Sequence, residues 1–243
     1  MKAAKRLGAA LVSGMMCVGT ANALALLDSS MYSTITADAD GNVTVGGVNF
    51  VAQGLPGAVF TVGSNGGFSG LGVFGRQTNG EIDNLETVTM SWGYYAAIQD
   101  FSVALLYNGP EFNDVAEVAM VTASIEGGGT VVGQLTVDAA NDEVATWAWS
   151  NVVGSVPSMN QDPATQFEGG AWKVANPFGN LRVNQLVFTA IPGFCGTGGG
   201  TCTNQSDYVL SSVNVVPEPG TYSLLLAGLA AVGFIARRRR IPR

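Results

Sequence analysis

The 243-residue chain contains no histidine and only three cysteines. Without histidine it can build neither a Ser-His-Asp nor a Cys-His catalytic arrangement, and it lacks the commonest zinc ligand. These absences remove the usual general base and the usual nucleophile activator of hydrolases. The sequence therefore favours a protein that is not an enzyme.

Basic residues are also scarce between the two ends of the chain. Of the 11 lysines and arginines, only Arg76, Lys173 and Arg182 fall within residues 24–215, where 17 acidic residues lie. Three positive against seventeen negative charges leave −14 on this central part, which the −7 of the whole chain conceals. Because phosphate binding needs basic side chains, nucleic acid is excluded as a partner. Cations or neutral sugars suit such a surface better.

The N-terminus has the pattern of a secretory signal peptide. Lys2, Lys5 and Arg6 precede an apolar stretch at residues 7–18, and small residues follow in A-N-A and A-L-A at 21–25. A basic start, a short apolar middle and small residues at the cleavage point are typical of export signals. Cleavage after Ala23 and cleavage after Ala25 both fit, and we place the boundary at Ala23, so that residues 1–23 form the signal peptide.

The C-terminus predicts a single transmembrane helix. Residues 221–236 carry no charge, and as a helix they would span about 24 Å of a hydrocarbon core of about 30 Å. Four arginines follow directly: Arg237, Arg238, Arg239 and Arg240. Such a cluster halts translocation and stays on the cytoplasmic side, so we expect a cytoplasmic C-terminus before any processing.

A proline-flanked tripeptide, Pro217, Glu218 and Pro219, stands directly before this apolar stretch. Two prolines break any helix and leave an extended, accessible segment, which fits either a stiff spacer or a processing site. The order of P-E-P, apolar helix and arginine cluster over residues 216–243 resembles the PEP-CTERM sorting signal of Gram-negative bacteria.

The resemblance implies a specific fate for the protein. It implies processing at the P-E-P site by an exosortase, a membrane-embedded cysteine protease-transpeptidase, after a transient stay in the inner membrane. It also implies a host that makes extracellular polysaccharide, and hence an exported cell-surface or matrix protein with a structural role in an exopolysaccharide or biofilm layer.

The body of the chain, residues 24–215, predicts one all-β domain. Short stretches with two-residue alternation are separated by glycine-rich turns, and long helical periodicity is scarce. Strands are expected at 44–51, 58–62, 85–92, 116–125, 130–137, 144–149, 171–175, 181–189 and 207–216, with 171–175 and 181–189 forming a hairpin and 154–170 a long loop. This pattern favours a two-sheet β-sandwich of jelly-roll type. The segments G-L-G-V at 70–73 and S-D-Y-V-L-S-S-V at 206–213 resemble parts of exosortase-sorted sandwich domains.

An acidic cluster follows the N-G turn at 79–80 and contains Glu81, Asp83 and Glu86. Clustered oxygen donors are what Ca²⁺ requires, but a solvated acidic turn has the same composition. Alternation places Glu86 on the same face as Val88, Met90 and Trp92, and a buried Glu86 would need a cation or hydrogen bonds. Calcium is the one cofactor that the sequence suggests, and a calcium-assisted, lectin-like carbohydrate-binding module is the alternative function.

Six aromatic residues leave two interpretations open: Trp92, Tyr94, Tyr95, Trp147, Trp149 and Trp172. They could form a platform on which sugar rings stack, or they could fill the core, which is commoner for aromatics on alternating strands.

The two cysteines of the body, Cys195 and Cys202, lie in the glycine-rich segment F-C-G-T-G-G-G-T-C. Outside the cytoplasm a disulfide between them is expected, although two free thiols fit the same sequence.

Overall fold

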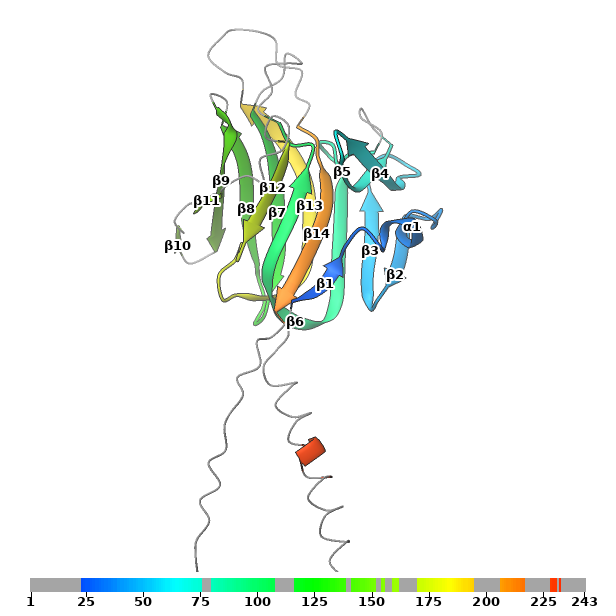
Figure 1. Cartoon of the computed structure of the whole chain (residues 1–243), viewed down its shortest axis with the longest axis vertical. Coiled ribbons are helices and arrows are strands. Elements are labelled where there is room, and N and C mark those ends of the chain that lie inside the picture. Colours follow the sequence, from blue (N-terminus) through cyan, green and yellow to red (C-terminus); the bar gives the residue numbers. More distant parts are fainter. Residues whose placement is uncertain are drawn as a thin grey trace, which may run out of the picture.

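The body of the chain folds into a single antiparallel sheet in the computed structural model (Figure 1). The structure describes residues 23–75, 80–107, 116–138, 141–151, 154–155, 159–161, 170–194, 206–216, 228–230 and 232. One short helix, α1 (Tyr32–Ile35), precedes the second strand. The strands are β1 (Leu24–Leu27), β2 (Asn42–Val45), β3 (Val48–Gln53), β4 (Val59–Asn65), β5 (Phe68–Phe74), β6 (Thr87–Ala104), β7 (Ala116–Ile125), β8 (Thr130–Asp138), β9 (Asn141–Asn151), β10 (Gly154–Ser155), β11 (Met159–Gln161), β12 (Ala171–Ala175), β13 (Arg182–Phe194) and β14 (Val209–Val216). The all-β prediction is confirmed.

The long strand β6 holds the two halves of the sheet together. Along one edge it pairs first with β13 and then with β12, and along the other edge first with β3 and then with β14. Ser91 pairs with Gln185 and Ala96 with Val183, so four residues of β6 lie opposite the single residue Asn184. This bulge bends the strand, because extra residues on one side of a ladder increase local curvature and twist.

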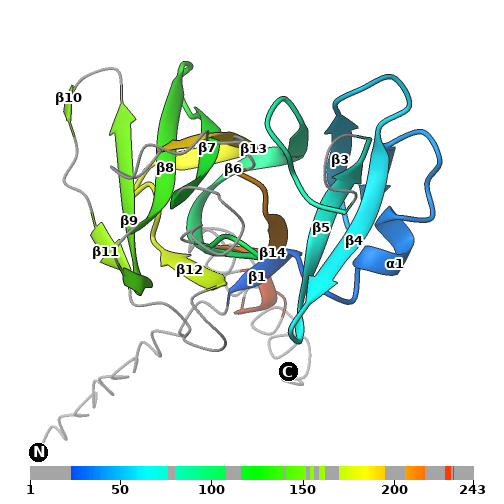
Figure 2. The ribbon, with the colours of Figure 1, turned by 90° about the horizontal axis from the view of Figure 1, so that it is seen from above.

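The bend corrects the expectation of a two-sheet sandwich. The main path runs β10-β9-β8-β7-β13-β6-β14-β5-β4 within one sheet, which curls into a half-barrel. Figure 2 shows β7, β8, β9, β12 and β13 on one side and β3, β4 and β5 on the other, with β6 passing between them. The two facing layers are thus two parts of one hydrogen-bonded sheet.

The expected hairpin of β12 and β13 is also wrong. Both strands pair with β6, so they follow each other along its edge and do not pair with each other. The connection N-P-F-G-N is held differently: the Asn176 amide donates to the Gln99 carbonyl at 2.7 Å, and Trp147 Nε1 donates to the Pro177 carbonyl at 2.8 Å. Phe178, the next residue along the chain, is 1 % exposed and belongs to the core.

Large aromatic side chains fill the inside of the half-barrel. The ring of Phe101 lies edge-on to Trp147 at 5.2 Å and to Phe188 at 5.7 Å between centroids. Trp147 and Trp172 are buried, as is most of Trp92, which confirms the core interpretation for these three. Tyr94, at 43 % exposed, is different and faces solvent.

The two ends of the body lie side by side. Leu24 of β1 pairs with Val215 of β14, so the predicted mature N-terminus and the sorting segment leave the same end of the sheet. Cleavage after Ala25 would remove half of β1.

The signal peptide, Cys195 and Cys202, the P-E-P tripeptide and the arginine cluster lie outside the described residues and stay predictions. In the described part no helix is long and apolar enough to cross a membrane, and of residues 221–236 only 228–230 and 232 are described, as helix.

Candidate functional site

The acidic segment after Gly80 is laid directly on the backbone of β4 and β5. A Cβ at position 72 would come within 2.0 Å of the Gly80 carbonyl oxygen, and one at position 63 within 2.3 Å, so only glycine permits this approach. The Val73 amide donates to the Glu81 carbonyl at 3.0 Å. Gly63 of β4 and Gly72 of β5 therefore let the segment that carries Glu81 lie against the sheet.

Glu81 shares a hydrogen bond with Asp207, which was not among the predicted ligands. Burial raises the pKa of Glu81 to about 9, and a hydrogen bond to the Asp207 side chain and the negative charges of Asp207 and Asp83 add to this effect. A backbone hydrogen bond holds the two acid-bearing segments together, because the Ile82 amide donates to the Tyr208 carbonyl at 2.6 Å. The pair therefore retains a proton at neutral pH.

Asp83 and Glu86 form a separate, closed turn. Asp83 is 4 % exposed and Glu86 is 0 % exposed, which confirms that Glu86 shares the buried face of Val88 and Met90. The Asp83 amide donates to Glu86 Oε2 at 3.2 Å, and the Glu86 amide donates to the Asp83 carbonyl at 3.0 Å. Thr189 Oγ1 donates to the Glu86 carbonyl at 2.7 Å, which fastens the turn to β13.

The Glu81–Asp207 pair and the Asp83–Glu86 turn do not together form a metal-binding cluster. Among the described residues no group of three or more His, Cys, Asp or Glu side chains is placed to hold a metal ion. Calcium binding by Glu81, Asp83 and Glu86 stays a prediction, and a melting curve with and without calcium would test it.

The raised pKa of Glu81 predicts a stability that falls as pH rises. The unfolded carboxyl loses its proton near the ordinary value of 4.5 and the folded one near 9, so unfolding releases a proton between these values. Raising the pH in this window therefore favours the unfolded state. Replacement of Glu81 by Gln should flatten the pH dependence and raise the melting temperature near pH 8.

This is measured by thermal melts between about pH 5 and about pH 8 in the presence of a chelator. Asp40→Asn, at an exposed acid, is the matched control and should retain the slope of the wild type. Identical slopes for the wild type and Glu81→Gln would show that Glu81 is ionised at neutral pH.

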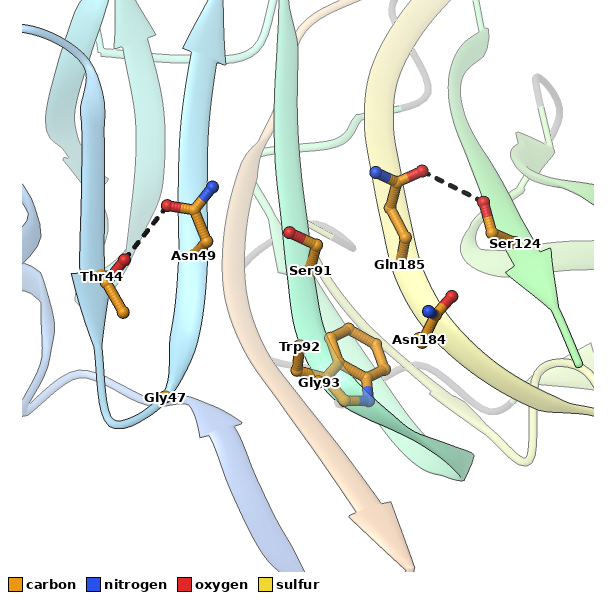
Figure 3. Close-up of a pocket in the computed structure, with 9 residues that line it drawn as sticks. All are labelled: Thr44, Gly47, Asn49, Ser91, Trp92, Gly93, Ser124, Asn184 and Gln185. Carbon is orange, nitrogen blue, oxygen red and sulfur yellow. Dashed lines mark hydrogen bonds between the residues drawn. The ribbon is translucent and has the colours of Figure 1, made fainter.

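A second feature is a line of polar side chains that crosses the outer face of the sheet, which we call the polar row (Figure 3). Each member is the direct cross-strand neighbour of the next: Thr44 on β2, Asn49 on β3, Ser91 on β6, Gln185 on β13 and Ser124 on β7. The row lines a hollow of about 480 Å³ together with Gly47, Trp92, Gly93 and Asn184. None of these nine residues is charged.

Two hydrogen bonds set the direction of the amides in the polar row. Thr44 Oγ1 donates to Asn49 Oδ1 at 3.2 Å, and Ser124 Oγ donates to Gln185 Oε1 at 3.0 Å. Both amide nitrogens consequently point away from these hydroxyl groups: in Figure 3 that of Gln185 points toward β6, and that of Asn49 points mainly along β3. Sequence analysis missed this row, because its members are scattered from position 44 to position 185 and only the strand register aligns them.

The comparison with known families finds the PEP-CTERM protein-sorting motif over residues 215–240. No curated protein and no solved structure matches the chain. The first two residues of the match, Val215 and Val216, are the last two of β14 and pair with Ile98 and Ala97 of β6. The chain thus carries the sorting motif immediately beyond a central strand, and the motif implies an exported, surface-sorted protein that an exosortase processes.

Proposed function

We propose that the protein is a non-catalytic structural component of the extracellular polymer layer, delivered there through its sorting motif. The observation that carries this proposal is the direct passage from β14 into the motif, without a spacer. A cut at the P-E-P tripeptide would release the whole β body with its last strand intact. The cargo is therefore the folded sheet itself.

The buried acids of the body support a structural role. Asp100 accepts a hydrogen bond from Asn214 Nδ2 at 2.7 Å and lies 3.2 Å from Lys173 Nζ, so it joins β6 to β14 and to β12. The Glu117 carboxylate accepts a hydrogen bond from the Tyr107 amide, and the Tyr107 carbonyl accepts one from the Glu117 amide at 3.2 Å. Both carboxylates hold neighbouring segments of the fold together, and neither lines the hollow at the polar row.

The pairing of β1 with β14 supports display at a surface. Since Leu24 and Val215 are neighbours, the mature N-terminus and the anchor segment would leave the body at one end. While the tail is in the membrane, that end faces the membrane and the rest of the sheet extends away from it. The net charge of the body would keep it soluble once it is released.

Fractionation of host cells with and without the exosortase gene tests the proposal. The protein should be recovered with the extracellular polymer from the first strain and with the inner membrane from the second. Recovery of the wild-type protein from the periplasm or inner membrane of both strains would exclude a place in the layer.

A further inference from the structure

We propose that the polar row binds a neutral polysaccharide chain laid across the strands, an inference that rests on the proposed function and gives it a binding site. Nothing in the sequence motif specifies a ligand. The site is identified by the register, charge and direction of its side chains.

The charge of the hollow selects a neutral ligand. The body of the chain carries 17 acidic residues, yet the nine residues around the hollow are all uncharged. Cations find no carboxylate there, and an anionic polymer would meet a net acidic body with no basic side chain lining the hollow. Neutral hydroxyl groups, which both donate and accept hydrogen bonds, match amides and serine hydroxyls.

The polar row differs from the row beside it on the same face. Two residues along each strand, the register aligns Asn42, Val51, Thr89, Val187 and Thr122, and the last four of these are β-branched. Such residues are the ordinary filling of a half-exposed sheet surface. The polar row has Asn49, Ser91 and Gln185 in its centre instead, so exposure alone does not account for its composition.

The donors of the row are held in fixed directions on either side of β6. Asn49 Nδ2 points away from Thr44 and Gln185 Nε2 points away from Ser124, because the two side-chain carbonyl oxygens accept hydrogen bonds from those hydroxyl groups. Within the described part of the chain neither amide nitrogen has a protein acceptor. Two fixed donors on either side of a hydroxyl can hold the hydroxyl or ring oxygens of successive sugar units.

The shape of the hollow suits a chain better than a compact molecule. Five neighbouring strands at about 4.8 Å spacing give the row a length of about 19 Å, enough for several sugar units. Gly47 and Gly93 leave the surface open beside the row, and the volume of about 480 Å³ is within the range of ligand sites. Trp92, Gly93 and Asn184 of the β-bulge line the hollow, and bulges are common beside binding sites.

An exposed aromatic residue follows the hollow in the sequence. Tyr94 comes directly after Gly93 and is 43 % exposed, whereas Trp92, Trp147 and Trp172 are buried. Aromatic faces pack against the apolar faces of pyranose rings, so an exposed tyrosine one residue beyond the hollow is compatible with a sugar ligand.

The test is affinity electrophoresis of the mature protein, purified from its host, in gels that contain the extracellular polysaccharide of that host. Anion exchange first separates the polysaccharide into a neutral and an anionic fraction. We expect retardation by the neutral fraction alone, unchanged by a chelator. The double variant Asn49→Ala with Gln185→Ala should bind about tenfold more weakly or not at all, since it loses both fixed amide donors.

Gln134→Ala is the matched control, because Gln134 is an exposed glutamine on the same face, on β8 and outside the hollow. It should bind as the wild type does, and melting curves should show both variants folded. Retardation by the anionic fraction alone, by neither fraction, or equally of the double variant would overturn the inference. The proposed function fails separately, if the wild-type protein is not recovered with the polymer layer. It survives if the double variant remains in the layer while the polar row proves inactive.

Discussion

Simultaneous replacement of Pro217 and Glu218 by alanine should trap the protein in the inner membrane with its tail attached. The motif covers residues 215–240, and the two changes remove the extended, proline-fixed backbone that a processing enzyme needs to grip. The retained residues, 220–243, make up about a tenth of the 25.0 kDa chain, so the trapped form should be about 2.5 kDa heavier than the mature one. Immunoblots of membrane and extracellular fractions measure both changes.

The double variant should leave the stability of the folded body unchanged. β14 ends at Val216, and the altered residues come after the last cross-strand pair of the sheet, Val216 with Ala97. The melting temperature of the body should therefore equal that of the wild type. Pro56→Ala, at an exposed proline in the turn before β4, is the control and should be processed normally. If the double variant has the mass and location of the wild-type protein, P-E-P is only a spacer.

The arginine cluster can be tested on the same blots. Replacement of Arg237, Arg238, Arg239 and Arg240 by glutamine should weaken the retention and orientation of the tail during export, because these cations stop translocation. The body should again be unaffected, since its core ends with β14.

Local signals in the sequence were sufficient for the sorting motif and for individual strands. The alternation of L-E-T-V-T-M-S-W correctly placed Val88, Met90 and Trp92 on the buried side, since two-residue periodicity is a property of the strand itself. The same alternation ends at Gly93, so the strand was expected to stop at Trp92. In the structure β6 continues to Ala104 through a bulge, and that continuation turns the expected two sheets into one.

The candidate sites depend on contacts between distant segments, which periodicity cannot supply. Burial of Glu86 followed from alternation, but Thr189, whose hydroxyl donates to the Glu86 carbonyl, lies 103 residues away in the sequence. Asp207 reaches Glu81 only because the segment before β14 runs past Ile82. The polar row needs the register of four strand pairs at once, and a shift of one residue in any of them would turn its side chains to the other face.

Phe101→Ala should destabilise the body more than any of the other substitutions. The Phe101 ring is fully buried and contacts Trp147 and Phe188 edge-on, so it packs residues of β9 and β13 against the second half of β6. Removing a buried phenylalanine ring typically costs about 3–5 kcal/mol, a large part of the roughly 5–15 kcal/mol that holds a domain together. Thermal melts of purified protein measure the loss.

Phe74→Ala is the matched control, because Phe74 on β5 is 51 % exposed. Its free energy of unfolding should change by no more than about 0.5 kcal/mol. Phe101→Leu should lie between the two, since it keeps most of the apolar volume. Equal melting temperatures for Phe101→Ala and Phe74→Ala would mean that the Phe101 ring does not hold β9 and β13 against β6, although it lies edge-on to Trp147 and Phe188.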